Sequence, residues 1–500
     1  MVRRRPFHPP FALVLGLLLG GLALVAAPAP GVVLAREGPT GLGNAIKARL
    51  RKAAVPERGV GIVWAGRGHD SRWLQEDGAD RRLIPASAAK IFTAAAILDL
   101  LGPGAQVLTT LDARGRIEGG VLQGDLVVHG GGDPSLGDEP FQTSPLEVPD
   151  RFAAQVAAKG IRRVTGAVVV DDLLFDDDTR HATWTAEDRQ AAYGAGIAAL
   201  TLRRGCCHVL AKGADRVGAP AQLAASTGWG GAQVDNQVRT SASGRPALGA
   251  RFDGNRLVLT GEVPRGQSGA VEVPVPEPAL LFAHAFAERL RAHGVTVDAA
   301  PRRARSAEDA APGRTVAVHA APLAPLLEHM LVESDNVYAS TLFKLAGAVV
   351  TGRGSWASGE VAVARMLERR GVERPDASGA FPTRILDGSG LSPANRTTAQ
   401  ALVDVLLSFD RDLVRGPLLR RALATSAAEG TMRKRLRDGS WAGRVHAKTG
   451  TLNDVRVRAL AGYVDATDGR DGRVFAILLN GGVATHGVID DVVRLLAATP

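Results

Sequence analysis

The pattern of hydrophobic and polar positions divides the chain into helix-rich flanks and a strand-rich middle. Near the N-terminus, the apolar run at 59–66 predicts a buried strand, and residues 87–101 predict a helix. After Arg314 the helical period returns. Helices are expected at 324–347, 397–410 and 487–498, and strands at 443–451, 458–466 and 473–482.

The middle of the chain, from about Leu101 to Gly313, has a different pattern. Short strand-like stretches such as 124–131 and 256–263 lie between glycine-rich turns, with one helix expected at 278–294. A chain of 500 residues is too long for one compact core. We therefore expect a multi-domain α/β protein. Its main domain would comprise 36–100 and 314–500, split by an inserted β-rich region at 101–313 that forms two subdomains.

Residues 1–35 have the features of a secretory signal peptide. A basic start with Arg3, Arg4 and Arg5 precedes an apolar stretch, and Val33-Leu34-Ala35 offers small residues for cleavage. The alternative is an uncleaved membrane anchor, but the apolar stretch is short and contains glycines. We expect export to the periplasm or the exterior of the cell envelope, by either the general secretory or the twin-arginine route.

Charge and cysteine content exclude several classes of function. Loss of the leader would lower the net charge from +9 to +6, and no basic run interleaved with aromatic residues predicts nucleic-acid binding. The charge instead fits a peripheral association with an acidic cell envelope. Cys206 and Cys207 are the only cysteines, so they form either a strained vicinal disulfide or two partly buried thiols. No histidine pattern indicates a metal site.

The stretch "PASAAKIFTAAAILDLLG" places a serine and a lysine on one face of the expected helix. Residues three apart are neighbours there, so the Ser87 hydroxyl and the Lys90 amine can touch. A serine hydroxyl needs an adjacent base to become a nucleophile, and a buried lysine with a lowered pKa can be that base. Ser87 and Lys90 are therefore candidate catalytic residues, although such a pair also occurs by chance.

Two further motifs follow in the order that penicillin-binding proteins and serine β-lactamases use. Ser334-Asp335-Asn336 lies between helical stretches, and Lys448-Thr449-Gly450-Thr451 ends a predicted strand. Ser334 could relay a proton to a leaving amine, Asn336 could hold Lys90, and Lys448 could keep Lys90 neutral and attract an anionic substrate. Thr449, Gly450 and Thr451 are the expected substrate-binding residues, and the N–H groups of Ser87 and Thr451 the expected oxyanion hole.

With these motifs, the chain resembles the D-alanyl-D-alanine carboxypeptidase/endopeptidase family, the class C low-molecular-mass penicillin-binding proteins of peptidase family S13. Four further stretches carry the resemblance: "GGGDPSL", "VDNQVRT", "DGSGLSPANRTT" and "RALAGYV". The resemblance implies a β-lactamase/DD-peptidase-like fold split by an insertion, with Ser87, Lys90, Ser334, Asn336 and Lys448 as catalytic residues. It also implies cleavage of peptidoglycan stem peptides and cross-links through an acyl-serine, inhibition by β-lactam antibiotics, and no cofactor.

Two other classes of function stay open. A serine β-lactamase or esterase would use the same first steps, but 247 residues separate Ser87 from Ser334, far more than a β-lactamase uses. No ExxLN segment or GxSxG elbow is present. A non-catalytic, penicillin-sensing, peptidoglycan-binding protein is the other alternative, and intact catalytic motifs argue against it. The balance between carboxypeptidase and endopeptidase activity cannot be read from these motifs.

Overall fold

The computed structural model describes residues 40–67, 73–466, 472–483 and 485–498. The predicted leader, residues 1–35, lies outside these described residues. Within them, no helix has both the length and the apolar composition that crossing a bilayer requires. The α/β class predicted from the sequence is confirmed, because several sheets and helices share the fold.

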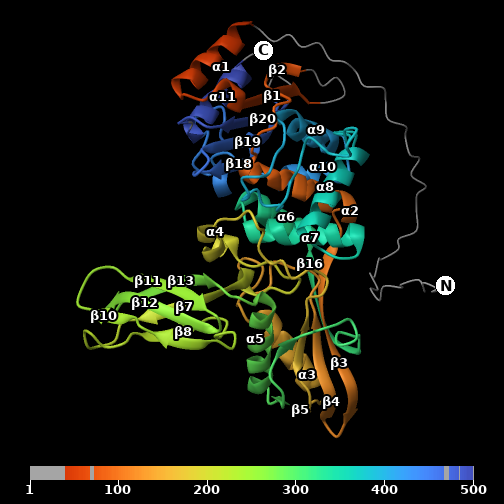
Figure 1. Cartoon of the computed structure of the whole chain (residues 1–500), viewed down its shortest axis with the longest axis vertical. Helices are drawn as coiled ribbons and strands as arrows, with labels where there is room; N and C mark the ends of the chain where they lie inside the picture. Colours follow the sequence, from red (N-terminus) through yellow and green to blue (C-terminus); the bar gives the residue numbers. More distant parts are fainter. Residues whose placement is uncertain (1–39, 68–72, 467–471, 484, 499–500) are drawn as a thin grey trace, which may run out of the picture. The chain divides into compact units, whose positions relative to one another are not determined.

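A six-stranded antiparallel sheet joins the two ends of the described chain (Figure 1). Its strand order is β17-β18-β19-β20-β1-β2, so the strands that follow the N-terminal helix lie beside strands from the C-terminal quarter. The predicted strands at 59–66, 443–451, 458–466 and 473–482 are confirmed. The strands span Val60–Gly66 (β1), Trp73–Asp77 (β2), Ala424–Thr425 (β17), Val445–Leu452 (β18), Val457–Val464 (β19) and Arg473–Asn480 (β20).

Both faces of this sheet are covered, which explains why β1 is a continuous apolar run rather than an alternating one. Ile62 and Trp64 pack on one face with helices α1 (Thr40–Lys52) and α11 (His486–Ala498). Val63 and Ala65 point to the other face and join a helical core. Successive side chains of a strand point to opposite faces, so one strand contributes to both cores.

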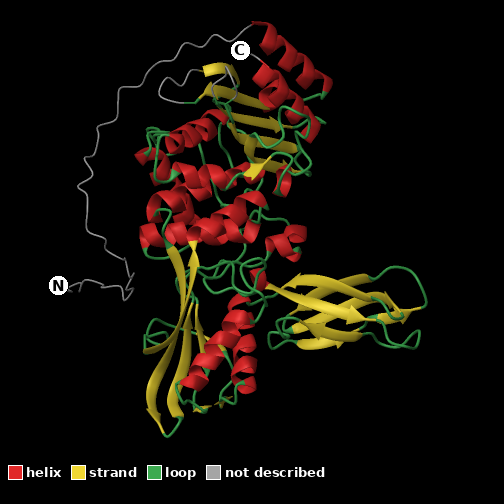
Figure 2. Cartoon of the chain, turned by 180° about the vertical axis from the view of Figure 1, so that it is seen from behind, coloured by secondary structure: helices red, strands yellow, loops and turns green. Residues whose placement is uncertain are grey.

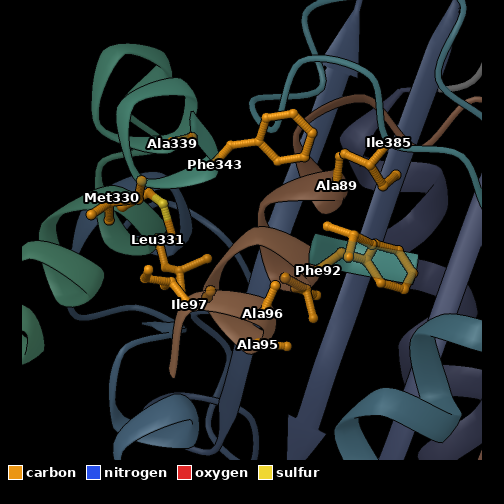
Figure 3. Packing of buried hydrophobic residues seen from close by; sticks show 14 of the residues in the cluster. Ala89, Phe92, Ala95, Ala96, Ile97, Met330, Leu331, Ala339, Phe343 and Ile385 are labelled. Atoms are coloured by element: carbon orange, nitrogen blue, oxygen red, sulfur yellow. The ribbon is translucent and has the colours of Figure 1, made fainter. Parts of the chain in front are cut away.

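The helical layer on the second face holds α2 (Lys90–Leu101), whose residues 90–98 are all buried. Figure 3 shows Phe92 and Ile97 of α2 packed among side chains of neighbouring helices, such as Leu331 and Phe343. The predicted helix at 324–347 divides in two, with the Ser334-Asp335-Asn336 motif at the break. The surrounding helices are α6 (Leu323–Val332), α7 (Asn336–Thr351), α8 (Trp356–Arg369), α9 (Ala399–Asp410) and α10 (Gly416–Arg421).

A seven-stranded sheet occupies the middle of the chain and is covered by two helices (Figure 2). The sequence predicted one helix there, now α5 (Pro278–Ala292), and missed α3 (Glu147–Ala158) and the short α4 (Ala186–Gln190). β16, which begins at Arg314, pairs with β3 in this sheet. The strands span Gln106–Glu118 (β3), Val121–His129 (β4), Arg163–Val164 (β5), Val168–Asp171 (β6), Thr296–Val297 (β14), Arg302–Arg303 (β15) and Arg314–Pro322 (β16).

Two smaller sheets follow within the same region, in the orders β13-β7-β8 and β10-β12-β11, with β9 pairing β12. Cys206 and Cys207 begin β7 as free, buried thiols, so the second of the two alternatives for this pair is confirmed. Burial raises the pKa of Cys206 to about 12 and that of Cys207 to about 11. The strands span Cys206–Lys212 (β7), Gln222–Ala225 (β8), Gln233–Asn236 (β9), Arg239–Ser241 (β10), Ala247–Asp253 (β11), Arg256–Pro264 (β12) and Ser268–Pro274 (β13).

The segment between β6 and β7 is tied to the helical layer by a buried cation. Lys344 of α7 has a fully buried side chain, and its Nζ donates to Asp176 Oδ1 at 2.6 Å and to the carbonyl of Asp178 at 2.8 Å. The same amine lies 4.5 Å from the centre of the Trp356 ring. This contact fixes the segment that also carries Trp184.

We predict that Lys344→Ala destabilises the protein by about 3 kcal/mol, because it removes one partner of a buried ion pair and leaves Asp176 uncompensated. Urea unfolding followed by tryptophan fluorescence measures the change. Lys434→Ala, which removes an exposed lysine, is the matched control and should shift the free energy of unfolding by less than about 0.5 kcal/mol. Equal effects of the two substitutions would contradict the structural importance of this ion pair.

Candidate active site

The predicted nucleophile lies in a tight turn rather than in a helix. Ala86–Ala89 form a 3-10 turn, and α2 begins only at Lys90. Ala86 adopts a left-handed backbone with φ of +46°, a strained conformation for a residue with a side chain. Gly390 and Gly450 lie against this turn. A Cβ on Gly390 would come within 1.9 Å of the Ala86 carbonyl oxygen, and a Cβ on Gly450 within 2.7 Å of the Pro85 carbonyl oxygen. The surrounding glycines therefore let neighbouring backbone close in on Ser87.

Lys90 is fully buried and makes three short contacts. Its Nζ lies 3.0 Å from Ser87 Oγ, 2.7 Å from Asn336 Oδ1 and 2.6 Å from the carbonyl oxygen of Ser389. The last two oxygens can only accept hydrogen bonds. A neutral amine has two N–H bonds and one lone pair, so donation to these two oxygens leaves the lone pair for the Ser87 hydroxyl. That is the arrangement a general base requires.

The pKa of Lys90 fits this role. Burial lowers it from its ordinary value of 10.5 to about 7, against the opposing influence of the Asp387 and Asp335 carboxylates. The sequence suggested that the charge of Lys448 would keep Lys90 neutral, but desolvation is the main cause. At neutral pH a substantial fraction of Lys90 is therefore unprotonated and able to accept a proton.

The second motif is held by a helix cap. Asp335 Oδ1 accepts hydrogen bonds from the N–H groups of Val337 at 2.8 Å and Tyr338 at 3.1 Å, so Asn336 becomes the first residue of α7. Ser334 has a left-handed backbone with φ of +64°. Its half-buried hydroxyl makes no hydrogen bond to the residues that the structure describes, and this leaves it available to a bound molecule.

The guanidinium group of Arg204, in the segment between β6 and β7, lies close to the capping carboxylate of Asp335. Arg204 Nη1 lies 3.4 Å from Asp335 Oδ2, and His329 Nε2 lies 3.7 Å from the same oxygen. Burial alone would raise the pKa of Asp335, but the nearby imidazole of His329, the charge of Arg204 and the capped N–H groups hold it below its ordinary value. The carboxylate thus stays ionised as a helix cap close to Lys90.

The third motif lies within β18, where Lys448 pairs with Ala461 and Gly450 with Ala459 of β19. Lys448 is fully buried, and its Nζ donates to the Thr449 carbonyl at 3.0 Å. Burial and the nearby charge of Lys90 lower its pKa well below the ordinary value. The Thr451 hydroxyl lies 2.8 Å from Nε2 of His486, at the start of α11, a contact that the sequence did not suggest.

The structure thus brings Ser87, Lys90 and Asn336 into direct contact, with the β18 motif packed against the nucleophile turn. Sequence reasoning missed the turn that begins at Asp387. The fully buried Asp387 carboxylate accepts five hydrogen bonds and shapes the turn that directs the Ser389 carbonyl at Lys90. The donors are Gly390 N (2.9 Å), Asn395 Nδ2 (2.9 Å), Ser392 N (2.7 Å), Ser389 Oγ (3.0 Å) and Trp184 Nε1 (2.9 Å).

The chain is similar in sequence to known D-alanyl-D-alanine carboxypeptidases. Residues 42–499 match the model of the D-Ala-D-Ala carboxypeptidase 3 (S13) family. A D-alanyl-D-alanine carboxypeptidase from an Actinomadura species is 32% identical over 483 residues, which cover 92% of this chain and 85% of the relative. The D-alanyl-D-alanine carboxypeptidase DacB of Haemophilus influenzae is 26% identical over 80% of this chain and 81% of its own length.

Solved structures agree on the fold. The crystal structure of penicillin binding protein 4 (dacB) from Haemophilus influenzae superposes with a TM-score of 0.75 at 23% identity, covering 91% of this chain and 98% of that one. A second structure of that protein, complexed with a novel β-lactam, gives a TM-score of 0.68 over the same shares of both chains. With its motifs, its fold and a match that spans nearly all of the described residues, this chain belongs to the D-Ala-D-Ala carboxypeptidase 3 (S13) family.

Proposed function

We propose that this protein is a serine D-Ala-D-Ala carboxypeptidase and DD-endopeptidase that acts on peptidoglycan stem peptides and their cross-links. The observation that carries the proposal is the Lys90 amine, which is buried, has its pKa lowered to about 7 and lies 3.0 Å from Ser87 Oγ. The named activity of the Actinomadura relative supports the substrate class. Residues 36–100 and 314–500 would form the catalytic domain and 101–313 the inserted region, although β16 (Arg314–Pro322) pairs with β3 in the sheet of the inserted region.

The chemistry would proceed through an acyl-enzyme. Ser87 Oγ attacks the carbonyl carbon of the penultimate D-alanine as its proton passes to Lys90. The N–H groups of Ser87 and Thr451 stabilise the oxyanion. Ser334 passes a proton from Lys90 to the leaving amine, and the C-terminal D-alanine departs. Water then attacks the ester with Lys90 again accepting a proton, which releases the shortened peptide and restores Ser87.

The remaining motif residues would bind the substrate. Lys448, Thr449 and Thr451 provide an amine and hydroxyl groups for its terminal carboxylate, and Gly450 allows an extended peptide to lie along the edge of β18. A cross-link presents the same D-alanyl bond, so one site can serve both activities. β-Lactam antibiotics would acylate Ser87 in place of the peptide. We expect the reaction to take place outside the cytoplasm, after export directed by residues 1–35. The protein would then associate with the cell envelope.

Replacement of the nucleophile tests this assignment directly. Ser87→Ala should lower D-alanine release from pentapeptide stems, and monomer release from cross-linked dimers, by at least about 10³-fold, because no acyl-enzyme can form. Mass spectrometry of the products measures both and shows which activity dominates. Ser243→Ala, at an exposed turn, is the control and should stay active. Full turnover by the Ser87 variant would contradict the proposal. Acylation of the unmodified protein by penicillin without peptide turnover would indicate a sensor.

The pH dependence of acylation follows from Lys90. Only the neutral amine can accept the Ser87 proton, so the rate of acylation by penicillin should rise with pH through about 7 and level off above it. Stopped-flow measurement of acylation between pH 5 and 9 checks this expectation. A rate that remains low at pH 7 and rises only near 10 would mean that Lys90 keeps its ordinary pKa and is not the base.

The indole of Trp184 offers a test of how the inserted region influences the base. Trp184→Phe keeps the aromatic packing but removes a hydrogen-bond donor from Asp387. The negative charge of that carboxylate is then less compensated, which raises the pKa of Lys90. We expect acylation to fall about threefold at pH 6 and to change little at pH 9. Trp356→Phe is the matched control, because its ring packs 5.6 Å from that of Trp184 while its buried N–H has no hydrogen-bond partner. A loss that is equal at both pH values would reveal only a structural effect.

A further inference from the structure

A hollow of about 550 Å³ lies at the end of α2 remote from the candidate active site. Its size is typical of sites that bind small molecules or headgroups. Four arginines from the end of α8 and from the turn between α9 and α10 face it, together with one carboxylate and one hydroxyl. The lining residues are Asp99, Arg369, Arg370, Ser408, Arg411 and Arg415.

Positive charge exceeds negative charge in this hollow. Asp99 forms ion pairs with both Arg369 and Arg370, and Asp412 with both Arg370 and Arg415. Each of the two carboxylates is therefore shared between guanidinium groups, and Arg369, Arg370 and Arg415 together carry one more positive charge than these two carboxylates. Planar guanidinium groups bind phosphate oxygens in a bidentate manner, so the site is complementary to a phosphate-bearing anion.

Two exposed apolar side chains stand beside these arginines. Leu413 and Val414 are 88% and 65% exposed, and they lie between Arg411 and Arg415 in the sequence. The turn is ordered, because Asp412 Oδ1 accepts hydrogen bonds from the N–H groups of Val414 at 3.1 Å and Arg415 at 2.9 Å. Exposed apolar side chains that are flanked in the sequence by arginines match the boundary between lipid headgroups and acyl chains.

The position of this surface leaves the candidate active site free. Lys90 begins α2 and Asp99 lies in its last turn, so nine residues, or about 14 Å of helix, separate them. A molecule bound to the hollow would therefore contact one end of α2, and the substrate would approach the other.

We propose that this arginine-lined hollow and the Leu413-Val414 turn bind the surface of a membrane that contains anionic phospholipid. The guanidinium groups hold a headgroup phosphate while the two apolar side chains enter the acyl boundary. Attachment would be peripheral and sensitive to salt, because the net charge is small and the inserted apolar area is limited. It would hold the enzyme at the envelope with its active site directed away from the lipid.

Vesicle flotation of the exported protein tests the proposal. Phosphatidylglycerol vesicles at low salt should retain the unmodified protein, and phosphatidylcholine vesicles should not. Leu413→Ser with Val414→Ser should weaken binding about tenfold. Arg411→Gln with Arg415→Gln should weaken it by about fivefold for each arginine. Val483→Ser is the matched control, since Val483 is 66% exposed at another loop and should leave binding unchanged. Penicillin acylation of each variant checks that it is folded.

The other outcomes would overturn the proposal. Retention that neither pair of substitutions changes would show that another segment, such as an unprocessed leader, binds the vesicles. Retention lost with the arginine substitutions but not with the apolar ones, together with competition by inorganic phosphate, would identify a small-anion site in place of a membrane surface. Equal retention on both vesicle types would exclude recognition of the anionic headgroup.

Discussion

Most of this site depends on the removal of one lysine amine from water. Lys90 can act as a base at neutral pH only if its charged form is disfavoured, and burial is the main cause of its lowered pKa. This explains why α2 is apolar on every side rather than amphipathic, with residues 91–98 all buried. A helix that packs on all of its faces can carry a fully desolvated lysine at its first position. The hydrophobic core and the chemistry are thus set by the same helix.

Burial alone would make the amine too weak a base to be useful, and two carboxylates oppose it. Asp387 and Asp335 both raise the pKa of Lys90, yet neither forms a direct ion pair with it. Asp387 instead receives five hydrogen bonds, and Asp335 caps α7 while it faces Arg204 and His329. Donors that share these negative charges limit how strongly they attract a proton to Lys90. A pKa near 7 then arises from a balance between desolvation and two partly compensated anions.

The sequence predicted those parts of the fold and site that depend on local spacing. Ser87 and Lys90 are three residues apart, which predicted their contact. The order of the three motifs predicted that Asn336 and Lys448 belong to the same site. The helix α3 was missed because Pro145 and Pro149 make its start resemble a turn. The roles of Asp387 and Trp184 could not be predicted, because 203 residues separate the two partners of their hydrogen bond. The stretch that begins at Asp387 carried part of the family resemblance, but the sequence assigned no role to its residues.

The two donors that moderate the carboxylates have a common origin. Trp184 and Arg204 both lie in the segment between β6 and β7, and each reaches a different anion beside Lys90. Lys344 holds the same region from the opposite direction through Asp176 and Asp178. Because Asp387 and Asp335 act on one amine, a shift of the segment that carries Trp184 and Arg204 would change how far both negative charges are compensated. The segment that carries Trp184 and Arg204 is therefore part of the electrostatic environment of the base, although it lies far from Lys90 in the sequence.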